Sequence, residues 1–417
     1  MGVDLSGKVV LRWESASDCA ALLEPGGIDA VWLQSGAPSV AGAQVIPPGG
    51  VRLVKLEDAG HARPGETVAV KAGVWPGAHA TRGSGGGFVA GATQRAWVDA
   101  NGYLVAWLRA LYPEQPPVLA YLPDRDAGIT EGRVIAYDSL ELALAEAWCA
   151  GGNYILAPDA AYREALLKGN QEALAAWKQM GRTARWLKEQ RSLFRRPPAQ
   201  TITVLVEPGE ATAEIANLMY RQSASPDLVS AANLPSPDPA RRAIVVAAGI
   251  RSFSADLRKL LLAHARAGAT VVTDHCEEPV WWRVPGLKPA RQFEDREFHT
   301  LGAGRIVAYH EAIADPGDFA LDVIDLAAGR RPVRLWEMSA AVAVVSRADA
   351  RSAPLLRVVN YGSPGRSETM ARVHGVFASA TLLRPEGQPV SLRIYRRGGS
   401  TEVMLPSLGR VAVVVFG

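Results

Sequence analysis

The chain is poor in cysteine, and it has neither a long apolar run nor an excess of charge. Its three cysteines, Cys19, Cys149 and Cys276, lie far apart and form no CxxC pair, which excludes a disulfide framework and a thiolate zinc site. No apolar run reaches the roughly 18 residues of a membrane span, so no span is predicted. The net charge of +3 comes with scattered arginines, and so weak a field predicts no nucleic-acid partner.

Motifs for metals and cofactors are also missing. His61 and His79 stand alone, without the HExxH or HxH partner that a zinc site needs. The glycine cluster Gly83–Gly87 lacks the Gly-Lys-Ser/Thr ending and the preceding strand of a phosphate-binding loop. We therefore expect no metal and no cofactor, and we interpret the glycines as a flexible loop.

The N-terminus shows no export signal. Residues 1–10 include Asp4 and Lys8 and no apolar core, so the sequence as it stands predicts a cytoplasmic protein. A Met-Gly start is also what remains when a leader has been replaced, in which case the protein is secreted or periplasmic. The sequence leaves the compartment open.

The first part of the chain, residues 1–196, has the pattern of a reduced β/α-barrel. Short β-branched runs alternate with helical patterns, which predicts βαβ units and a mostly parallel sheet. Six or seven strands are too few for the eight units of a full barrel, which need roughly 250 residues. The connection from Gln34 to Val51 also shows no helical pattern. The predicted strands are Val9–Trp13, Ala30–Leu33, Val51–Leu56, Thr67–Val74, Val118–Leu122 and Tyr154–Ala157, and the helices are Tyr103–Leu111, Leu140–Ala150 and Gln171–Phe194.

Two further parts follow the linker at Pro197-Pro198. Residues 197–330 alternate apolar strands with amphipathic helices, as a small flavodoxin-like, doubly wound α/β domain does. Its predicted strands are Thr201–Val206, Ala243–Ala247, Thr270–Thr273 and Arg305–Tyr309, and its helices are Ala211–Gln222, Ser254–Ala267 and Phe319–Ala328. Residues 331–417 lose the helical period and alternate apolar with polar residues between Gly, Pro and Ser turns, which predicts an antiparallel β-sandwich.

This order of parts resembles that of large glycoside hydrolases such as the trimeric bacterial β-galactosidases. They join a TIM barrel to a glutamine-amidotransferase-like domain and a small β-domain. The likeness is carried by RAIVVAAGIRSFSADLRKLLLAHARAGATVVTD and GAGRIVAYHE in the middle part, and by the strands from VHGVFASATLL to VAVVVF at the end. GVWPG and WVDANGYLVAWLRALYP also resemble an uncharacterised hydrolase-like family of bacteria. The resemblance implies a carbohydrate ligand and a homo-oligomer formed through the middle domain.

Two motifs of such hydrolases are absent. The chain has no Asn-Glu dipeptide, which in barrels of this kind supplies the acid/base, and no GxCxG nucleophile elbow. Cys276 lies in TDHCEE without flanking glycines. We therefore expect the middle domain to be non-catalytic.

Candidate site residues follow the barrel strands, because the carboxyl ends of parallel strands meet at one face. Glycoside hydrolysis needs two carboxyl groups, and the sequence offers Glu14, Glu57 and Asp99 as catalytic candidates. Aromatic rings beside carboxylates suit sugars. The expected substrate-binding residues are Trp13, Trp75, Trp97, Asn101, Asp58 and Asp159.

Structural roles compete with several of these assignments. Asp99 can cap the helix 103–111 and Asp159 the helix 160–167, since Asp is a favoured N-cap. Trp13 and Trp32 can belong to the barrel core. Two hypotheses follow: a glycoside hydrolase that uses a carboxylate pair, or an inactive relative that binds carbohydrate or serves as a scaffold.

Overall fold

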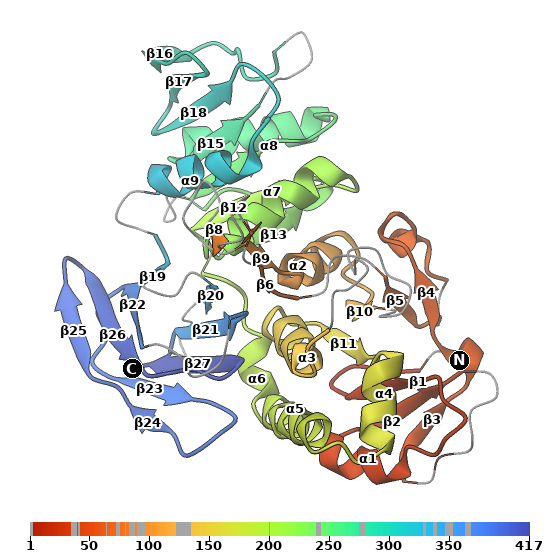
Figure 1. Ribbon diagram of the computed structural model, residues 1–417. Helices are drawn as coiled ribbons and strands as arrows, with labels where there is room; N and C mark the ends of the chain where they lie inside the picture. The colour runs from red at the N-terminus through yellow and green to blue at the C-terminus, as the bar shows by residue number, and fades with distance from the viewer. Residues whose placement is uncertain are drawn as a thin grey trace.

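A computed structural model shows three sheet-based parts, with the barrel at the lower right of Figure 1, the middle part above it and the C-terminal strands at the left. It describes residues 3–34, 40, 42–63, 65–71, 76–79, 81–82, 88–89, 97–121, 135–199, 201–238, 243–274, 280–327, 331–336, 340–346, 353–362 and 368–417. In the described part of the chain, no helix is long and apolar enough to cross a membrane.

The first part is an incomplete β/α-barrel. Its sheet has the order β3-β2-β1-β11-β10-β5-β4, and the pairings are parallel. If the sheet is followed from β1 through β2 and β3, and then from β4 through β5 and β10 to β11, the strands come in chain order, as they do in a barrel. The barrel is open between β3 and β4. The strands are β1 (Val10–Trp13), β2 (Ala30–Leu33), β3 (Gln44–Ile46), β4 (Arg52–Val54), β5 (Val68–Val70), β10 (Val118–Ala120) and β11 (Asn153–Leu156).

Alternate residues of these strands point to the inside and the outside of the barrel. Val10, Ala30, Trp32 and Ile46 share one interior cluster with residues of β5, β10 and β11. Their neighbours, such as Leu11 and Trp13, belong to the outer layer under the helices. The connection from Gln34 to Val51 has no α-helix among its described residues, as predicted, but it contains β3 and the short 3₁₀ turn η1 (Pro48–Gly50).

Helices cover the outside of this sheet. They are α1 (Ala20–Gly26), α2 (Gly102–Leu111), α3 (Ser139–Cys149), α4 (Ala160–Leu167), α5 (Gln171–Glu189) and α6 (Arg191–Phe194), with the 3₁₀ turn η2 (Leu56–His61) after β4. The long helix α5 packs closely on α1, where the Trp177 indole donates to the Leu22 carbonyl over 2.8 Å. Two short hairpin pairings lie between β5 and α2: β6 (Gly77–His79) with β9 (Trp97–Asp99), and β7 (Thr81–Arg82) with β8 (Phe88–Val89).

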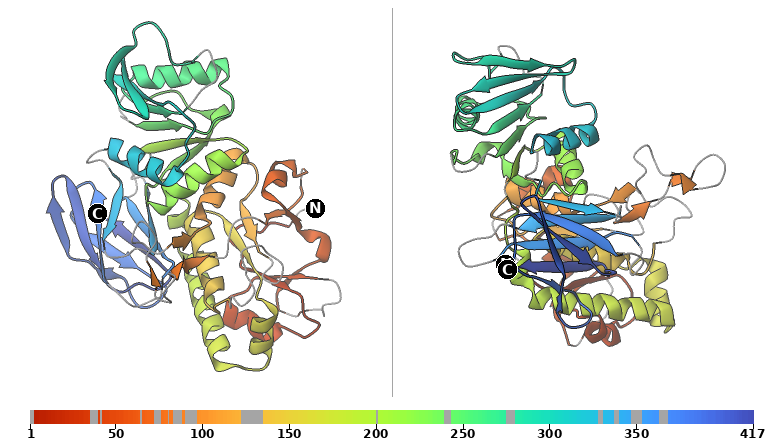
Figure 2. Two further views of the ribbon diagram at one scale, coloured as in Figure 1. Left: turned by 45° about the horizontal axis from the view of Figure 1, so that its top comes forward. Right: turned by 90° about the vertical axis from the view of Figure 1, so that its left-hand side faces the viewer.

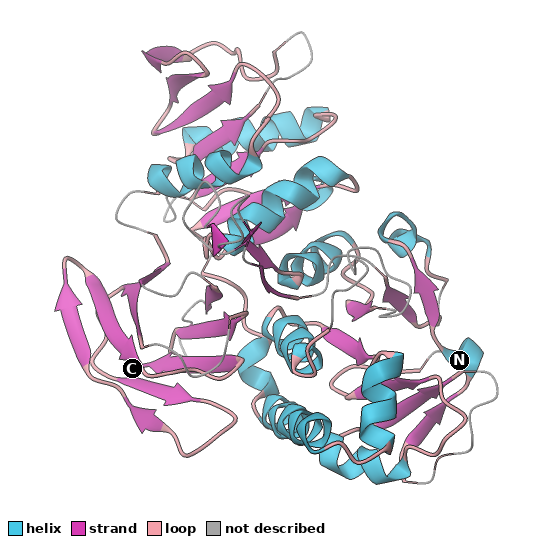
Figure 3. Cartoon of the chain, in the orientation of Figure 1, coloured by secondary structure: helices cyan, strands magenta, loops and turns pink. Residues whose placement is uncertain are grey.

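The middle part is a doubly wound sheet extended by a hairpin. Its parallel strands have the order β13-β12-β14-β15-β18, which is the flavodoxin order 2-1-3-4-5. The strands are β12 (Ile202–Val206), β13 (Asp227–Ser230), β14 (Ile244–Ala247), β15 (Thr270–Thr273), β16 (Lys288–Gln292), β17 (Arg296–Leu301) and β18 (Gly304–Tyr309), of which β16 and β17 are antiparallel. Helices α7 (Glu210–Arg221) and α9 (Pro316–Leu326) contact each other on one face, and α8 (Ala255–Arg266) covers the other. Figure 3 shows helices on both sides of this sheet.

The C-terminal part is an antiparallel β-sandwich. One sheet has the order β19-β22-β26-β25 and the other β20-β21-β27-β23-β24, and their facing residues form one apolar core. Figure 2 shows both sheets in its right-hand view. The strands are β19 (Val333–Trp336), β20 (Ala341–Ser346), β21 (Leu355–Asn360), β22 (Thr369–His374), β23 (Ala380–Leu383), β24 (Val390–Ser391), β25 (Ile394–Arg397), β26 (Ser400–Leu405) and β27 (Val411–Phe416).

The predicted fold is therefore confirmed: a reduced barrel, then a doubly wound α/β sheet, then a β-sandwich. The boundaries predicted at 196 and 330 stay predictions. The three parts share packing, because α2 contacts α7 and β13 while α3 contacts β21 and β27.

Candidate functional site

The carboxyl ends of β1 and β2 carry a compact polar cluster at the mouth of the barrel. Arg12 alternates with the outward-facing Leu11 and Trp13, so its side chain points to the barrel interior. Its guanidinium carbon lies 5.1 Å from the centroid of the Trp32 ring, which is part of the interior cluster. The Trp32 indole donates to the carbonyl oxygen of Pro48 over 3.3 Å. Two neighbouring strands and the turn after β3 thus fix Arg12.

Arg12 holds two polar side chains at this mouth. Its Nη2 lies 2.7 Å from Oε1 of Glu14 and donates to Oε1 of Gln34 over 3.3 Å. The Arg12 side chain is 8% exposed and the Glu14 side chain 28% exposed. Nε2 of Gln34 is buried and has no hydrogen-bond partner among the described residues. The cluster therefore presents the Glu14 carboxyl group towards solvent, with a fixed guanidinium group behind it.

A hollow of about 480 Å³ lies beside Glu14. Its lining residues are Glu14, Ser15, Ala160, Arg163, Glu164, Leu167 and Lys168. Glu164 of α4 is ion-paired with Lys168 over 2.5 Å, and this hydrogen bond lowers the pKa of its carboxyl. The hollow therefore contains two carboxylates, Glu14 and Glu164, and each is paired with a cation.

The predicted partners of Glu14 do not line this hollow. Glu57 and Asp58 are in η2 after β4, where Glu57 is 67% exposed and 3.5 Å from Lys55, and Asp58 is 3.8 Å from His61. Neither lines the hollow beside Glu14. Their position after a barrel strand agrees with the prediction, but the described contacts do not bring them together with Glu14.

Two other predicted site residues have structural roles. Trp13 is fully buried in the outer layer of the barrel, and its indole donates to the Ser17 carbonyl over 2.8 Å. Asp159 caps α4, since its carboxylate accepts the backbone N–H of Tyr162 over 2.6 Å. These are the core and capping alternatives that the sequence left open, and neither side chain lines the hollow.

Asp99 and Asn101 lie at the junction of the barrel with the middle part. Asp99 is buried at the end of β9 and interacts electrostatically with Arg221 of α7. Asn101 precedes α2 but makes no side-chain cap; its backbone N–H donates to Glu146 instead. Neither lines the hollow beside Glu14. Trp75 lies outside the described residues, as does the side chain of Trp97.

Sequence reasoning missed the buried carboxyl of Glu146 on α3. Its Oε1 accepts hydrogen bonds from the backbone N–H groups of Asn101 and Gly102, the latter over 2.9 Å, and from the hydroxyl of Tyr361 over 2.7 Å. Tyr220 of α7 is hydrogen-bonded to Tyr361 in turn. Burial raises the pKa of Glu146 to about 7, although the hydrogen bonds oppose this. The sequence feature that could have identified Glu146 is its helix, which is apolar on all sides. Such a helix is predicted to be buried together with its glutamates.

This carboxyl joins all three parts of the chain, and it is closed to ligands. Glu146 is 2% exposed, and a Cβ at Gly102 would lie 2.2 Å from the hydroxyl of Tyr220. We interpret the group as an interdomain contact rather than an active site.

Near the crevice where a doubly wound sheet binds ligands, two carboxylates of the middle part accept backbone N–H groups. In this strand order the crevice lies at the carboxyl ends of β12 and β14. Glu207, after β12, accepts the backbone N–H of Arg251 over 2.7 Å, and Asp274, after β15, accepts that of Gly249, after β14, over 3.0 Å. The expectation of a non-catalytic domain stays a prediction, because Cys276 lies outside the described residues.

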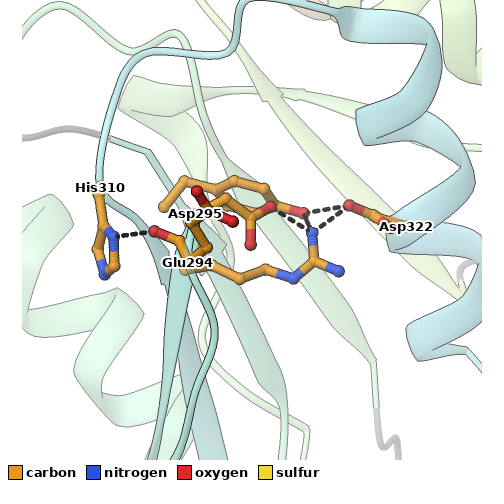
Figure 4. Close-up of polar contacts among 6 residues, drawn as sticks. Glu294, Asp295, His310 and Asp322 are labelled. Atoms are coloured by element: carbon orange, nitrogen blue, oxygen red, sulfur yellow. Dashed lines mark hydrogen bonds and ion pairs between the residues drawn. The ribbon is translucent and has the colours of Figure 1, made fainter.

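Figure 4 shows the polar contacts at the far end of this domain. Arg296 of β17 contacts Asp295 over 2.9 Å and also pairs with Asp322 of α9. The Tyr309 hydroxyl donates to Asp322 over 2.9 Å, and Nδ1 of His310 lies 3.0 Å from the Glu294 carbonyl oxygen. These contacts tie the β16–β17 hairpin to α9. Within the described residues no group of three His, Cys, Asp or Glu side chains is arranged to hold a metal ion.

Comparison with known proteins shows likeness of fold alone. No family model and no curated protein matches the chain. The chain is similar to a beta-galactosidase from Bacillus circulans sp. alkalophilus, with a TM-score of 0.54 and 10% identity over 93% of this chain and 63% of that one. It is also similar to alpha-L-fucosidase isoenzyme 2 from Paenibacillus thiaminolyticus, with a TM-score of 0.51 and 10% identity over 76% and 62% of the two chains.

A third similar structure is a catalytic mutant of Gan42B, a GH42 beta-galactosidase from G. stearothermophilus. The TM-score is 0.50 with 11% identity, over 87% of this chain and 61% of that one. The chain spans about three fifths of the length of each of these structures. The predicted resemblance to multidomain glycoside hydrolases is confirmed at the level of the fold. The amidotransferase likeness of the middle part stays a prediction.

Proposed function

We propose that this protein hydrolyses glycosidic bonds of a carbohydrate at the mouth of the barrel, with Glu14 as one of the two reacting carboxylates. The observation that carries the proposal is the Arg12–Glu14 ion pair of 2.7 Å at the carboxyl end of β1. In β/α-barrels this is the face on which active sites are built. The fold shared with a beta-galactosidase and a fucosidase supports carbohydrate as the ligand class.

The ion pair suits Glu14 to the role of nucleophile or general base. The guanidinium of Arg12 holds the Glu14 carboxyl group in place at the strand end. Glycoside hydrolysis needs one ionised and one protonated carboxyl group about 5–9.5 Å apart. The protonated group must come from another strand end. Glu57 and Asp58 after β4 remain candidates, and Asp124, which follows β10 in the sequence, lies outside the described residues.

A second candidate function is carbohydrate binding without hydrolysis. One observation favours it: Glu14 and Glu164, the two carboxylates that line the hollow, are both paired with cations. An ion-paired carboxylate is a poor proton donor. If no third carboxyl group reaches the site, a sugar can bind there without being cleaved.

A panel of chromogenic glycosides, together with calorimetric titration of the free sugars, separates the two functions. A hydrolase releases the chromophore from at least one glycoside, and the Glu14→Gln variant loses that release. A binding protein releases none but gives a binding isotherm that Glu14→Gln weakens. If neither turnover nor binding is found with any sugar, the proposal is wrong.

Assembly through the middle part remains a separate proposal that rests on the resemblance. Light scattering of the intact protein tests it, and a monomer at all concentrations would contradict it.

A further inference from the structure

The four-stranded sheet of the β-sandwich has an outer face that none of the preceding assignments uses. Its inward residues, such as Ala371, Val373 and Val403, are fully buried in the sandwich core. The alternate residues point outwards. We call these the outer face: Arg334 and Trp336 on β19, Met370, Arg372 and His374 on β22, Glu402 and Met404 on β26, and Arg393, Tyr395 and Arg397 on or next to β25.

The two edge strands of this sheet carry the same motif. On β19, the guanidinium of Arg334 lies 5.1 Å from the centroid of the Trp336 ring. At β25, that of Arg393 lies 5.0 Å from the centroid of the Tyr395 ring. The sheet order β19-β22-β26-β25 puts these two Arg-aromatic pairs at opposite edges. Three strand spacings separate the edges, which is about 14 Å.

An apolar strip connects the two pairs. Trp336 is directly opposite Met370 on β22, and Met370 is opposite Met404 on β26. Met404 and Tyr395 are 38% and 42% exposed. A ligand that lies across the strands therefore meets an aromatic ring, two thioethers and an arginine in succession.

The charge of the outer face is strongly positive. It holds four arginines and one acidic residue, Glu402, whose Oε1 lies 3.9 Å from Nε of Arg372. Arg334, Arg393 and Arg397 have no carboxylate partner within the described part of the chain. Guanidinium groups recognise anionic groups such as carboxylate and sulfate through paired hydrogen bonds to two oxygen atoms.

We propose that the outer face is a second binding site that holds an extended acidic glycan, a chain bearing uronate or sulfate groups. The span between the edges requires a chain rather than a single sugar, and the rings and methionines offer stacking surface for sugar faces. The arginines complement the negative groups. The arginines and the span of the outer face indicate a polyanionic ligand. That this polyanion is a glycan rests on the proposed function.

Binding of polygalacturonate to the intact protein, measured by calorimetry at low and moderate salt, tests this site. Dextran, which is neutral, and poly(dT), a single-stranded DNA, serve as comparison ligands. We expect the protein to bind polygalacturonate, with an affinity that falls as salt rises, and to bind dextran at least tenfold more weakly. The double variants Trp336→Ala/Tyr395→Ala and Arg334→Gln/Arg393→Gln should each weaken binding at least tenfold.

The matched control is the Arg291–Phe293 pair of the middle part. Its guanidinium carbon lies 5.6 Å from the ring centroid and Phe293 is 42% exposed, so Arg291→Gln/Phe293→Ala removes one guanidinium group and one aromatic ring from another surface. That variant should leave binding within twofold of the wild type, and all variants should keep the wild-type thermal midpoint. The Glu14→Gln variant should also bind polygalacturonate normally, which separates this site from the barrel mouth.

Several results would overturn the proposal. Equal loss of binding in the control variant would mean unspecific attraction to positive charge. Tighter binding of poly(dT), lost in the same outer-face variants, would identify a nucleic-acid surface instead. A wild-type dimer that becomes monomeric in Trp336→Ala/Tyr395→Ala would show that a second copy covers the outer face. If the wild-type protein does not bind polygalacturonate at low salt, the proposed glycan site is wrong.

Discussion

The carboxylate of Glu146 on α3 accepts a hydrogen bond of 2.7 Å from the hydroxyl of Tyr361, a residue 215 positions later in the chain. The same carboxylate accepts the backbone N–H of Gly102 at the start of α2. Tyr220 of α7 completes the contact through Tyr361. One buried titratable group therefore takes part in the docking of the barrel, the middle part and the sandwich.

Stability should depend on pH through Glu146. Burial raises the pKa of this carboxyl from its ordinary 4.5 to about 7, so the folded protein binds the proton more tightly than the unfolded chain. The stabilisation is complete below about pH 4.5 and is lost as the pH rises through 7. We expect the free energy of unfolding to fall by a few kcal/mol over this window, at about 1.4 kcal/mol per pKa unit.

Urea unfolding at pH 5, 6, 7 and 8 measures this slope. Glu146→Gln keeps the shape and an acceptor oxygen but cannot titrate, so its profile should be flatter than that of the wild type. Parallel profiles for the two proteins would show that Glu146 does not titrate in this range.

Ser223 should be held in a strained backbone conformation by its hydroxyl contact. Its φ is +55°, and its Oγ accepts the backbone N–H of Ala343 on the edge strand β20 over 3.0 Å. Ser223→Ala loses the hydrogen bond and keeps the strain, whereas Ser223→Gly loses the bond and relieves the strain. In denaturant unfolding we expect the glycine variant to be more stable than the alanine variant by about 1 kcal/mol. An alanine variant as stable as the wild type would argue against the contact.

Gly181 should be essential for the packing of α5 on α1. A Cβ at this position would lie 1.9 Å from the carbonyl oxygen of Pro25, so the helices must separate to accept it. We expect Gly181→Ala to lower the free energy of unfolding by about 2 kcal/mol or more. Gly49→Ala is the control, since a Cβ there meets nothing within 4 Å. Similar unfolding midpoints for the two variants would contradict the close approach.

Asp159 should act as a helix cap rather than as a ligand-binding residue. Asp159→Ala removes the acceptor for the Tyr162 N–H and should destabilise the protein by about 1 kcal/mol, while Asp159→Asn keeps a capping oxygen and most of the stability. Both variants should bind sugar like the wild type in calorimetry. If Asp159→Asn binds sugar more weakly while its stability is unchanged, Asp159 takes part in ligand binding.

Secondary structure could be predicted where burial follows a local period. The strand predicted at Thr270–Thr273 has those bounds, and the helix predicted at Ser254–Ala267 is found at Ala255–Arg266. The hairpin strand Lys288–Gln292 could not be predicted, because all five of its residues are exposed and carry no alternation. Its pairing depends on the neighbouring strand rather than on its own sequence.

The candidate site could be predicted only in part. Glu14 directly follows β1, at the face where parallel barrel strands end, and its role there stays a prediction. Arg12, which contacts Glu14, could not be predicted as part of the site. In the sequence it is only a charged residue in an apolar strand, and its contact with Trp32 depends on the register of β1 and β2. The rule that parallel strands end at one face does not apply to Asp99, because its strand, β9, pairs with β6 and is not part of the barrel sheet.

The central claim, hydrolysis at the barrel mouth, is tested most directly by the turnover of Glu14→Gln on the chromogenic glycoside that the wild type cleaves fastest. We expect kcat to fall by about 10²–10⁴-fold with an unchanged thermal unfolding midpoint, and Glu164→Gln, which alters the other carboxylate of the hollow, to keep turnover within a few-fold of the wild type. Turnover by Glu14→Gln equal to that of the wild type would contradict the account.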